Sequence, residues 1–199
     1  LFGAAGFMFT GLDPDALVVE LKDRLIEELD YRAEAANQRL FVEYYRDHPF
    51  IRVPEVIDGL STGRVLTTEL SAGARWEELQ TWSQEEQDLA GEAIFRFVFR
   101  SLYRLHAFNG DPHPGNYLFE PGGRVTFLDF GLVKRFTHDE VDLFHHLIDA
   151  FVLRGDMADF RRAVERAGLL RAGAPVTDER VGDWMGHFYA FVLEDRSTT

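Results

Sequence analysis

Cysteine is absent from the 199-residue sequence, which excludes a disulfide framework and thiol catalysis and fits a reducing, intracellular setting. Positive charge is also scarce, because 21 Lys and Arg residues stand against 34 Asp and Glu residues and give a formal net charge of −13. Nucleic-acid-binding proteins normally carry a basic surface, so we expect no nucleic-acid partner. No uncharged segment is long enough to span a bilayer, and we expect a cytoplasmic protein that is at most peripheral to a membrane.

What the sequence does contain is enough apolar material for a folded core, with 46% hydrophobic and 14% aromatic residues. The first residue is Leu1 rather than methionine, and residues 1–12 are apolar and glycine-rich without the basic start of a signal peptide. We therefore expect the chain to be the middle part of a longer gene product.

A long helix is predicted over about residues 14–45. Asp13-Pro14 has the cap and first-turn chemistry of a helix start, and Pro49 ends the helix. Apolar residues recur every four positions along its charged first half and form one stripe, made of Leu17, Leu21, Leu25 and Leu29.

The elements that follow indicate an α+β fold. Two hairpins are predicted, one from 53–58 and 64–70 and one from 117–119 and 124–128, because turn residues split apolar runs there. A loop rich in glycine and proline occupies 109–115. Strands that pair locally, with helices dominating after this loop, are typical of an α+β layout. The further predicted helices span 84–107, 141–151, 157–169 and 178–193.

The residues that carry chemistry lie in two short segments. Asp111 and Asn116 are five positions apart on the 109–115 loop and its end, and Asp129 follows a predicted strand and precedes Phe-Gly. A kinase has the same layout: a catalytic-loop Asp, an Asn five residues later that binds metal, and the magnesium-binding Asp of an Asp-Phe-Gly segment. Asp111 is therefore the candidate catalytic residue, and Asn116 and Asp129 are the candidate magnesium ligands beside ATP. The alternative is a Pro/Gly turn in which Asn and Asp serve only as turn residues.

With these motifs, the chain resembles the UbiB (AarF) family of atypical protein-kinase-like proteins. Its 110–116 loop reads Gly-Asp-Pro-His-Pro-Gly-Asn, as that of the family typically does, and the family's acidic helix motif appears as Glu28-Leu29-Asp30. The resemblance implies a protein-kinase-like fold with a partial N-lobe over 1–70, made of the long helix and a hairpin, and a mainly helical C-lobe over 71–199. It also implies an ATP-binding, magnesium-dependent kinase or ATPase linked to isoprenoid-quinone or prenyl-lipid metabolism, with a quinone or prenyl-lipid precursor and a membrane surface as partners.

The acidic helix gains a function from the same resemblance. Glu28 and Asp30 would belong to the active site, and Glu34 would be the helix glutamate that pairs with a phosphate-binding lysine. Taken alone, these three carboxylates would read as a solvated helix face.

The resemblance also implies which segment would bind the nucleotide base. The segment containing Thr68, Glu69 and Leu70 is similar to the strand and hinge that hold adenine through backbone groups, with Thr68 bordering the deep pocket. Without the resemblance, an edge strand running into a loop explains this segment equally well.

The chain departs from the family at the lysines. The Lys-x-Gly-Gln signature, the Ala-rich nucleotide loop and the strand lysine are all missing, since Lys22 and Lys134 are the only lysines and lie on the wrong side of the required positions. A site with metal ligands but no phosphate clamp has lost part of its electrostatic stabilisation, so we expect these 199 residues alone to be inactive. Asn109 also stands where many relatives place histidine.

Two other functions stay open. A small-molecule phosphotransferase of the aminoglycoside or choline kinase type carries a similar His-Pro-x-Asn loop, although the Glu28-Leu29-Asp30 helix argues against it. A pseudokinase that binds nucleotide or lipid and acts through a partner would explain the missing lysine.

No histidine is assigned to a metal, because the adjacent His145 and His146 would point about 100° apart on a helix. We expect His113 to order the loop by hydrogen bonding.

Overall fold

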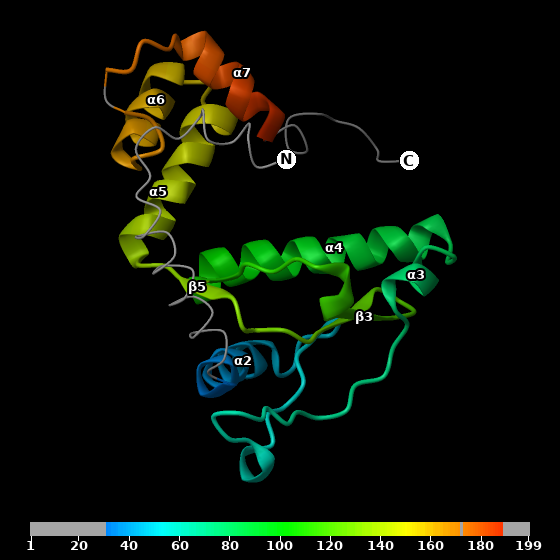
Figure 1. The fold of residues 1–199 in the computed structure, drawn as a ribbon. Helices are drawn as coiled ribbons and strands as arrows, with labels where there is room; N and C mark the ends of the chain where they lie inside the picture. Colours follow the sequence, from blue (N-terminus) through cyan, green and yellow to red (C-terminus); the bar gives the residue numbers. More distant parts are fainter. Residues whose placement is uncertain (1–30, 172, 189–199) are drawn as a thin grey trace, which may run out of the picture. The chain divides into compact units, whose positions relative to one another are not determined.

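The computed structural model describes residues 31–171 and 173–188, and this part of the chain combines helices with short strands in a mixed α+β fold (Figure 1). In chain order the elements are α2 (Tyr31–Tyr45), β1 (Ile51–Arg52), the 3-10 turn η2 (Asp58–Leu60), α3 (Trp76–Leu79), α4 (Gln84–Arg100), the π-helical turn η3 (Ser101–Leu105), β2 (Ala107–Asn109), the 3-10 turn η4 (Pro114–Asn116), β3 (Tyr117–Glu120), β4 (Arg124–Phe127), β5 (Val133–Arg135), α5 (His138–Ile148), the π-helical turn η5 (Asp149–Leu153), α6 (Met157–Arg166) and α7 (Asp178–Phe188).

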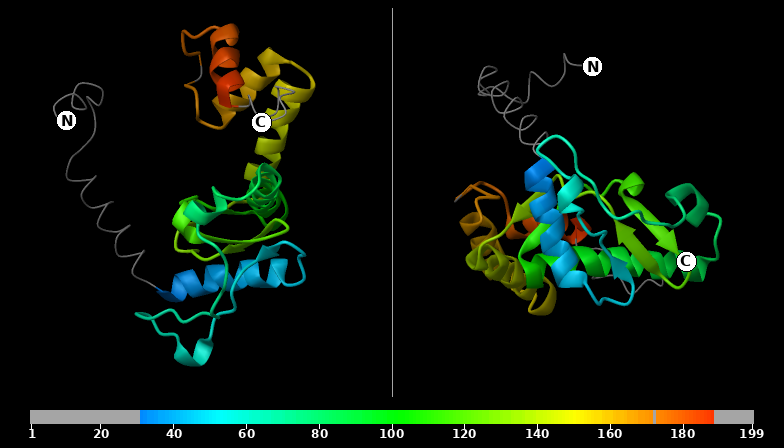
Figure 2. Two further views of the ribbon diagram at one scale, coloured as in Figure 1. Left: turned by 90° about the vertical axis from the view of Figure 1, so that its right-hand side faces the viewer. Right: turned by 90° about the horizontal axis from the view of Figure 1, so that it is seen from below.

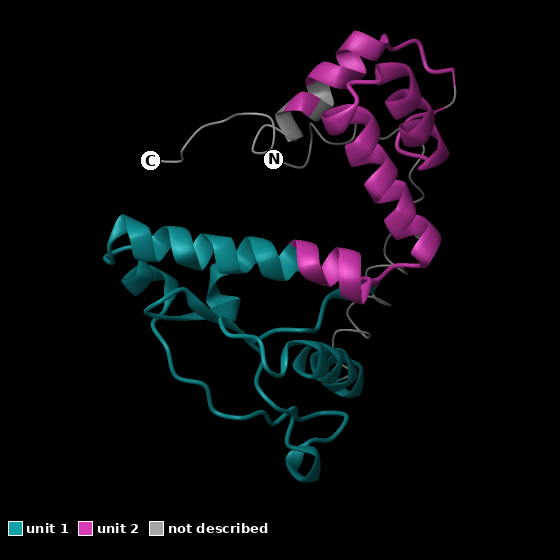
Figure 3. Cartoon of the chain, turned by 180° about the vertical axis from the view of Figure 1, so that it is seen from behind, with its two compact units in different colours: residues 1–98, 109–134 teal, residues 99–108, 135–199 magenta. Residues whose placement is uncertain are grey.

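The chain divides into two compact units (Figure 3). Unit 1 contains the described part of residues 1–98 together with 109–134, and unit 2 contains 99–108 with the described part of 135–199. The predicted division into lobes at residues 70 and 71 is a different partition and stays a prediction. Within the described residues, no helix combines the length and the hydropathy that a membrane crossing requires.

Unit 1 is built on a three-stranded sheet in the order β1-β4-β3. Strand β1 runs parallel to β4, with Ile51 opposite Val125, whereas β3 runs antiparallel to β4, with Tyr117 opposite Phe127. The predicted hairpin at 117–119 and 124–128 is therefore confirmed. In Figure 1 and in the left view of Figure 2, these strands lie between α2 and α4.

An aromatic cluster joins helices α2 and α4 of unit 1 to this sheet. Phe97 of α4 stacks on Phe127 of β4 with ring centroids 3.7 Å apart, and Phe41 of α2 contacts Phe97 at 5.5 Å and Phe130 at 4.9 Å. All four rings are buried, and they form an apolar cluster that includes Phe130, the residue after Asp129.

The β3–β4 turn is docked onto α4. Gly122 and Gly123 both have positive φ, at 80° and 74°, which other L-residues rarely adopt. The Gly122 N–H donates to the Glu86 carboxylate at 2.8 Å, and a Cβ placed on Gly123 would lie 2.8 Å from the Leu89 Cβ. Glycine is thus required at this turn by both conformation and space.

The predicted hairpin at 53–58 and 64–70 is wrong as a pair of regular strands. The two segments run antiparallel, but only isolated bridges form, between Val56 and Thr68 and between Thr62 and Val65. Pro54 offers no N–H to a ladder, and the Ser61 hydroxyl accepts the Thr67 N–H that a strand partner would otherwise bond.

The predicted helices agree with the structure where it describes them. Helix α2 covers the second half of the predicted 14–45 helix, and residues 14–30 lie outside the described residues. The 84–107 helix is present as α4 and η3, and it ends at His106, whose φ of 54° is left-handed. Helices α5, α6 and α7 match the remaining three predictions up to residue 188.

Unit 2 has an apolar core of its own, contributed by α5, η5, α6 and α7. Its buried members are Leu147, Ala150, Phe160, Ala163, Val164 and Val181. Helix α5 begins at a capping box, in which Glu140 N–H donates to the Thr137 hydroxyl and the Thr137 N–H donates to the Glu140 carboxylate.

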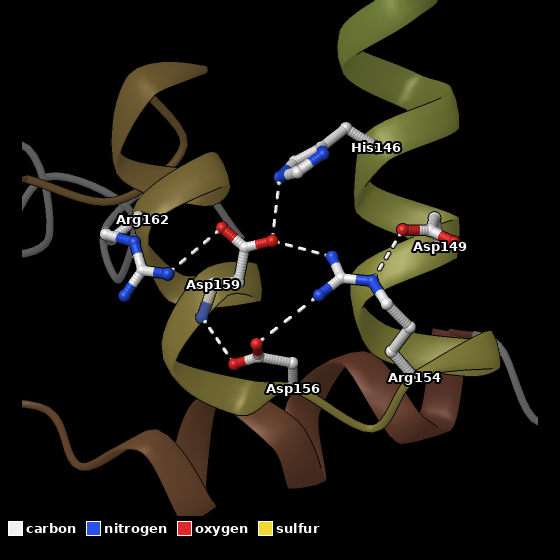
Figure 4. A network of polar contacts seen from close by, with 6 residues as sticks. All are labelled: His146, Asp149, Arg154, Asp156, Asp159 and Arg162. Atoms are coloured by element: carbon white, nitrogen blue, oxygen red, sulfur yellow. Dashed lines mark hydrogen bonds and ion pairs between the residues drawn. The ribbon is translucent and has the colours of Figure 1, made fainter.

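A polar network joins η5 to α6 on the surface of unit 2 (Figure 4). Arg154 donates to Asp149 and Asp159 at 2.6 Å each and contacts Asp156 at 3.3 Å. His146 lies 3.1 Å from the same Asp159 carboxylate. The hydrogen bond from Arg154 is the main reason why the pKa of Asp159 is lowered to about 2.

Candidate functional site

The residues of the predicted catalytic loop are held by short-range hydrogen bonds. Asn116 donates from Nδ2 to Asp111 Oδ2 at 2.9 Å, so the two predicted residues are paired directly. The Gly115 N–H donates to His113 Nδ1 at 3.1 Å, which confirms the ordering role predicted for His113. Burial and then the nearby charge of Asp111 raise the pKa of Tyr117, the first residue of β3.

Asp129 follows β4 and is tied to the same loop. The Leu128 N–H donates to the Asn116 carbonyl at 2.9 Å, and Asn109 Nδ2 donates to the Asp129 carbonyl at 2.7 Å. The Asp129 side chain is oriented by its own backbone, since Oδ1 accepts the Gly131 N–H at 2.9 Å. The structure therefore brings the Asp111–Asn116 pair and Asp129 into one region of unit 1.

Helix α2 adds Glu34 to this region. Its partly buried carboxylate accepts the Phe130 N–H, and burial followed by the charge of Asp129 raises the pKa of Glu34 above its ordinary value. A Cβ on Gly131 would lie 3.4 Å from Asp129 Oδ1 and 3.9 Å from Glu34 Oε2, so glycine leaves the space between the two carboxylates open. The lysine pairing predicted for Glu34 stays a prediction, and Glu28 and Asp30 lie outside the described residues.

The residues assigned to adenine have other contacts. The Glu69 N–H donates to the Glu55 carbonyl at 2.8 Å, and its carboxylate pairs with Arg52 at 2.8 Å. Thr68 forms an isolated β-bridge with Val56, and Leu70 is 94% exposed. None of these contacts involves Asp111, Asn116 or Asp129, and the adenine assignment stays a prediction.

Three residues around the site were not singled out as functional by the sequence. Asn37 Nδ2 donates to the Phe130 carbonyl at 3.1 Å, and Asn109 accepts the Asp111 N–H at 3.3 Å besides bonding Asp129. Arg75 donates to the Gly115 carbonyl at 3.2 Å from the segment before α3. An asparagine one turn after Glu34 and an asparagine two residues before Asp111 were visible signals, but their partners depend on the tertiary fold.

The oxygens in this region are of the chemical type that magnesium prefers. Asn116 Nδ2 donates to Asp111 and Asp129 Oδ1 accepts from Gly131, so Asn116 Oδ1 and Asp129 Oδ2 are the oxygens of these two side chains that could bind magnesium. Among the residues that the structure describes, no group of three or more His, Asp or Glu side chains could enclose a metal by itself. Few protein ligands are typical of magnesium that is also bound by water and phosphates.

Comparison with known proteins decides the family. A family described as "ABC1 atypical kinase-like domain" matches residues 1–163 of this chain. The chain belongs to the ABC1 atypical kinase-like family. The predicted resemblance to UbiB proteins is thereby confirmed, and membership in a kinase-like ABC1 family implies nucleotide binding.

Relatives in the ABC1 family come from distant organisms. "Protein ACTIVITY OF BC1 COMPLEX KINASE 1, chloroplastic" of Arabidopsis thaliana is 32% identical over 171 residues, which cover 84% of this chain and 25% of that protein. "Atypical kinase COQ8B, mitochondrial" of Rattus norvegicus is 33% identical over 141 residues, which cover 70% of this chain and 27% of that protein. The chain thus spans about a quarter of the length of these curated relatives.

A solved structure supports the fold of the ABC1 chain. The complex of Rv3197 with erythromycin from Mycobacterium tuberculosis matches with a TM-score of 0.74 and 32% sequence identity. The match covers 95% of this chain and 48% of the Rv3197 chain. The mixed α+β architecture is therefore shared by a relative over nearly all of these residues.

Proposed function

We propose that this chain forms the catalytic loop and metal site of an ATP-binding, magnesium-dependent atypical kinase or ATPase. The observation that carries the proposal is the pairing of Asp111 with Asn116 on one loop and the attachment of Asp129 to that loop through Asn109 and Leu128. Phosphoryl transfer needs little covalent help from a protein, so positioned oxygens of this kind supply most of what catalysis requires.

Each residue has a separate role in this proposal. Asp111 orients the attacking hydroxyl or water and takes up its proton, while the hydrogen bond from Asn116 Nδ2 keeps the carboxylate in place. Asn116 Oδ1 and Asp129 Oδ2 hold magnesium, which when bound neutralises charge on the phosphates. Thr68, Glu69 and Leu70 would receive the adenine ring through backbone groups.

The remaining parts of the proposal rest on the family. Residues 1–70 would form the partial N-lobe and residues 71–199 the mainly helical C-lobe of a protein-kinase-like fold. The acceptor would be a quinone or prenyl-lipid precursor at a membrane surface, as the resemblance to UbiB proteins implies. Glu28 and Asp30 would act on the nucleotide or on a lysine-bearing segment.

A nucleotide-binding pseudokinase that acts through a partner is the second candidate. Glu34 is predicted to pair with a phosphate-binding lysine, but its contacts in the described residues are the charge of Asp129 and the Phe130 N–H. A site without that lysine favours nucleotide binding without turnover. Magnesium-dependent ATP binding without measurable turnover in a protein that carries the family's strand lysine would select this candidate over the kinase or ATPase.

Calorimetric titration of a non-hydrolysable ATP analogue, with and without magnesium, tests the site. Asp129→Asn removes the one charged ligand and should weaken magnesium-dependent binding at least about tenfold, the size of one charge-assisted contact. Asp88→Asn, on the exposed face of α4 in the same unit, is the matched control and should bind as the parent does. Equal affinities for the parent and Asp129→Asn would refute the metal assignment.

A further inference from the structure

Two asparagine amides hold consecutive carbonyl groups of the segment that carries Asp129. Asn109, at the end of β2, donates to the Asp129 carbonyl at 2.7 Å, and Asn37, on α2, donates to the Phe130 carbonyl at 3.1 Å. The two donors come from elements that are 72 positions apart in the sequence, so only the folded unit brings them together.

The N–H groups of the same segment are also bonded to side chains. The Phe130 N–H donates to the Glu34 carboxylate, and the Gly131 N–H donates to Asp129 Oδ1 at 2.9 Å. Asp129 and Phe130 belong to neither a helix nor a strand, so no backbone ladder fixes them. Backbone groups that lack a ladder must be satisfied in another way, and here side chains do this at each peptide around Phe130.

The Phe130 side chain anchors the segment in the apolar core of unit 1. It is 0% exposed and packs against Phe41 of α2 with ring centroids 4.9 Å apart. The buried ring restrains the position of the segment, and the two amides restrain the orientation of its peptide planes. The Asp129 carboxylate depends on that orientation, because it accepts a hydrogen bond from the N–H of Gly131 two residues later.

We infer that Asn37 and Asn109 are positioning residues that hold the Asp129 carboxylate in the geometry required for metal binding. The inference rests on the proposed function of Asp129. Asn109 also accepts the Asp111 N–H at 3.3 Å, so one side chain joins the catalytic loop to the metal-ligand segment. Loosening either amide lets the Asp129 peptide rotate, and the carboxylate then meets the metal in the correct orientation for a smaller fraction of the time.

Gln38 provides a matched control for a purely structural amide. It is the neighbour of Asn37 on α2, is 0% exposed, and donates from Nε2 to the Pro54 carbonyl at 2.7 Å, away from the Asp129 segment. Gln38→Leu therefore removes a buried side-chain-to-backbone hydrogen bond of the same kind without touching the segment that carries Asp129.

The first measurement needs no nucleotide. Hydrogen–deuterium exchange, read by NMR, follows the Phe130 and Gly131 amides in the parent, Asn37→Leu, Asn109→Leu and Gln38→Leu. Both asparagine variants should exchange about tenfold faster at these two amides, the effect of losing one hydrogen bond, while Gln38→Leu leaves their rates within about twofold of the parent.

The second measurement is the magnesium concentration that gives half-saturation of a fluorescent ATP analogue. It should rise about tenfold in Asn37→Leu and Asn109→Leu and stay unchanged in Gln38→Leu. Asn109→His keeps a side-chain N–H donor and should recover most of the loss caused by Asn109→Leu.

Each outcome decides between the alternatives. Unchanged exchange at Phe130 and Gly131 in both asparagine variants overturns the inference, and so does an equal acceleration in Gln38→Leu, which would indicate general loosening. Faster exchange with an unaltered magnesium requirement also overturns it. If the parent itself binds no magnesium nucleotide, the proposed function fails, and with it the inferred metal role, whereas the exchange rates still show whether the two amides hold the segment.

Discussion

At the scale of single residues, Glu34 and Asp129 place two negative charges beside Gly131. Burial and the neighbouring charge raise the pKa of Glu34, which means that its ionised form is disfavoured in the folded chain. Glutamine keeps an oxygen for the Phe130 N–H and removes the repulsion. We expect Glu34→Gln to increase the free energy of unfolding at pH 7 by roughly 0.5 kcal/mol in urea titrations without metal.

Glu43→Gln is the control on the same helix. Glu43 is exposed and pairs with Arg46 at 2.7 Å, so its neutralisation removes an attraction and should not stabilise the chain. Equal stabilisation by both substitutions would mean that the effect comes from the lower net charge and not from the proximity of Glu34 to Asp129.

The sequence was most informative about residues whose chemistry is fixed by local spacing. Asp111, Asn116 and Asp129 could be proposed as site residues from their spacing on short, stiff segments, and the structure brings them into one region of unit 1. The hydrogen bonds of Asn37 and Asn109 to the segment of Asp129 could not be predicted in this way. Their amides bond carbonyl groups 93 and 20 positions away, and nothing in the local sequence specifies such a pairing.

At the scale of elements, the salt-bridge network of unit 2 joins η5 to α6 through Asp159. Because its folded pKa of about 2 is below the ordinary aspartate value of 3.8, Asp159 contributes stability that is present above pH 3.8 and is lost as the pH falls through about 2. Asp159→Asn should therefore lower the urea midpoint of unit 2 at pH 6 and have little effect near pH 2.

The comparison for this prediction is Asp142→Asn on α5, an exposed aspartate that lies 3.6 Å from His138. It should change the midpoint little at either pH, as expected for an exposed pair. A loss of stability in Asp159→Asn that is the same at pH 6 and pH 2 would show that the network acts through packing and not through charge.

The two predicted hairpins show why one element could be predicted and the other could not. The β3–β4 pair has a Gly-Gly turn and four successive residue pairs, so its pattern and its hydrogen bonds agree. The 53–70 segment has the β-branched composition of strands, but Pro54 lacks a donor and the Ser61 hydroxyl bonds Thr67. Such competition from side chains is not visible in a pattern of apolar residues.

At the scale of the whole molecule, every described residue of the candidate site belongs to unit 1. Phe160 is fully buried in the separate core of unit 2, and Phe160→Ala should cost about 3–5 kcal/mol of stability there. We expect the affinity for magnesium nucleotide to stay within about twofold of the parent, because binding draws on unit 1 alone. Thermal unfolding and calorimetric titration of the same samples measure both quantities.

Phe127→Ala provides the opposite case, since it removes the ring that stacks on Phe97 inside unit 1. This variant should lose both stability and nucleotide binding. If Phe160→Ala abolished binding at a temperature where the amides of β3 and β4 remain protected from exchange, the units could not be treated as energetically separate.

The docked β3–β4 turn also limits where this chain can be altered by engineering. A hairpin tip ordinarily accepts an inserted peptide tag. Here the Gly122 N–H is bonded to Glu86, and Gly123 leaves no room beside Leu89, so an insertion between them would push the hairpin off α4 and shift the strand that leads to Asp129. Gly59 in η2 has no neighbouring atom within 4 Å of an added Cβ. A reporter tag or a labelling cysteine is therefore best placed at Gly59, where the cysteine-free chain would give one site of attachment.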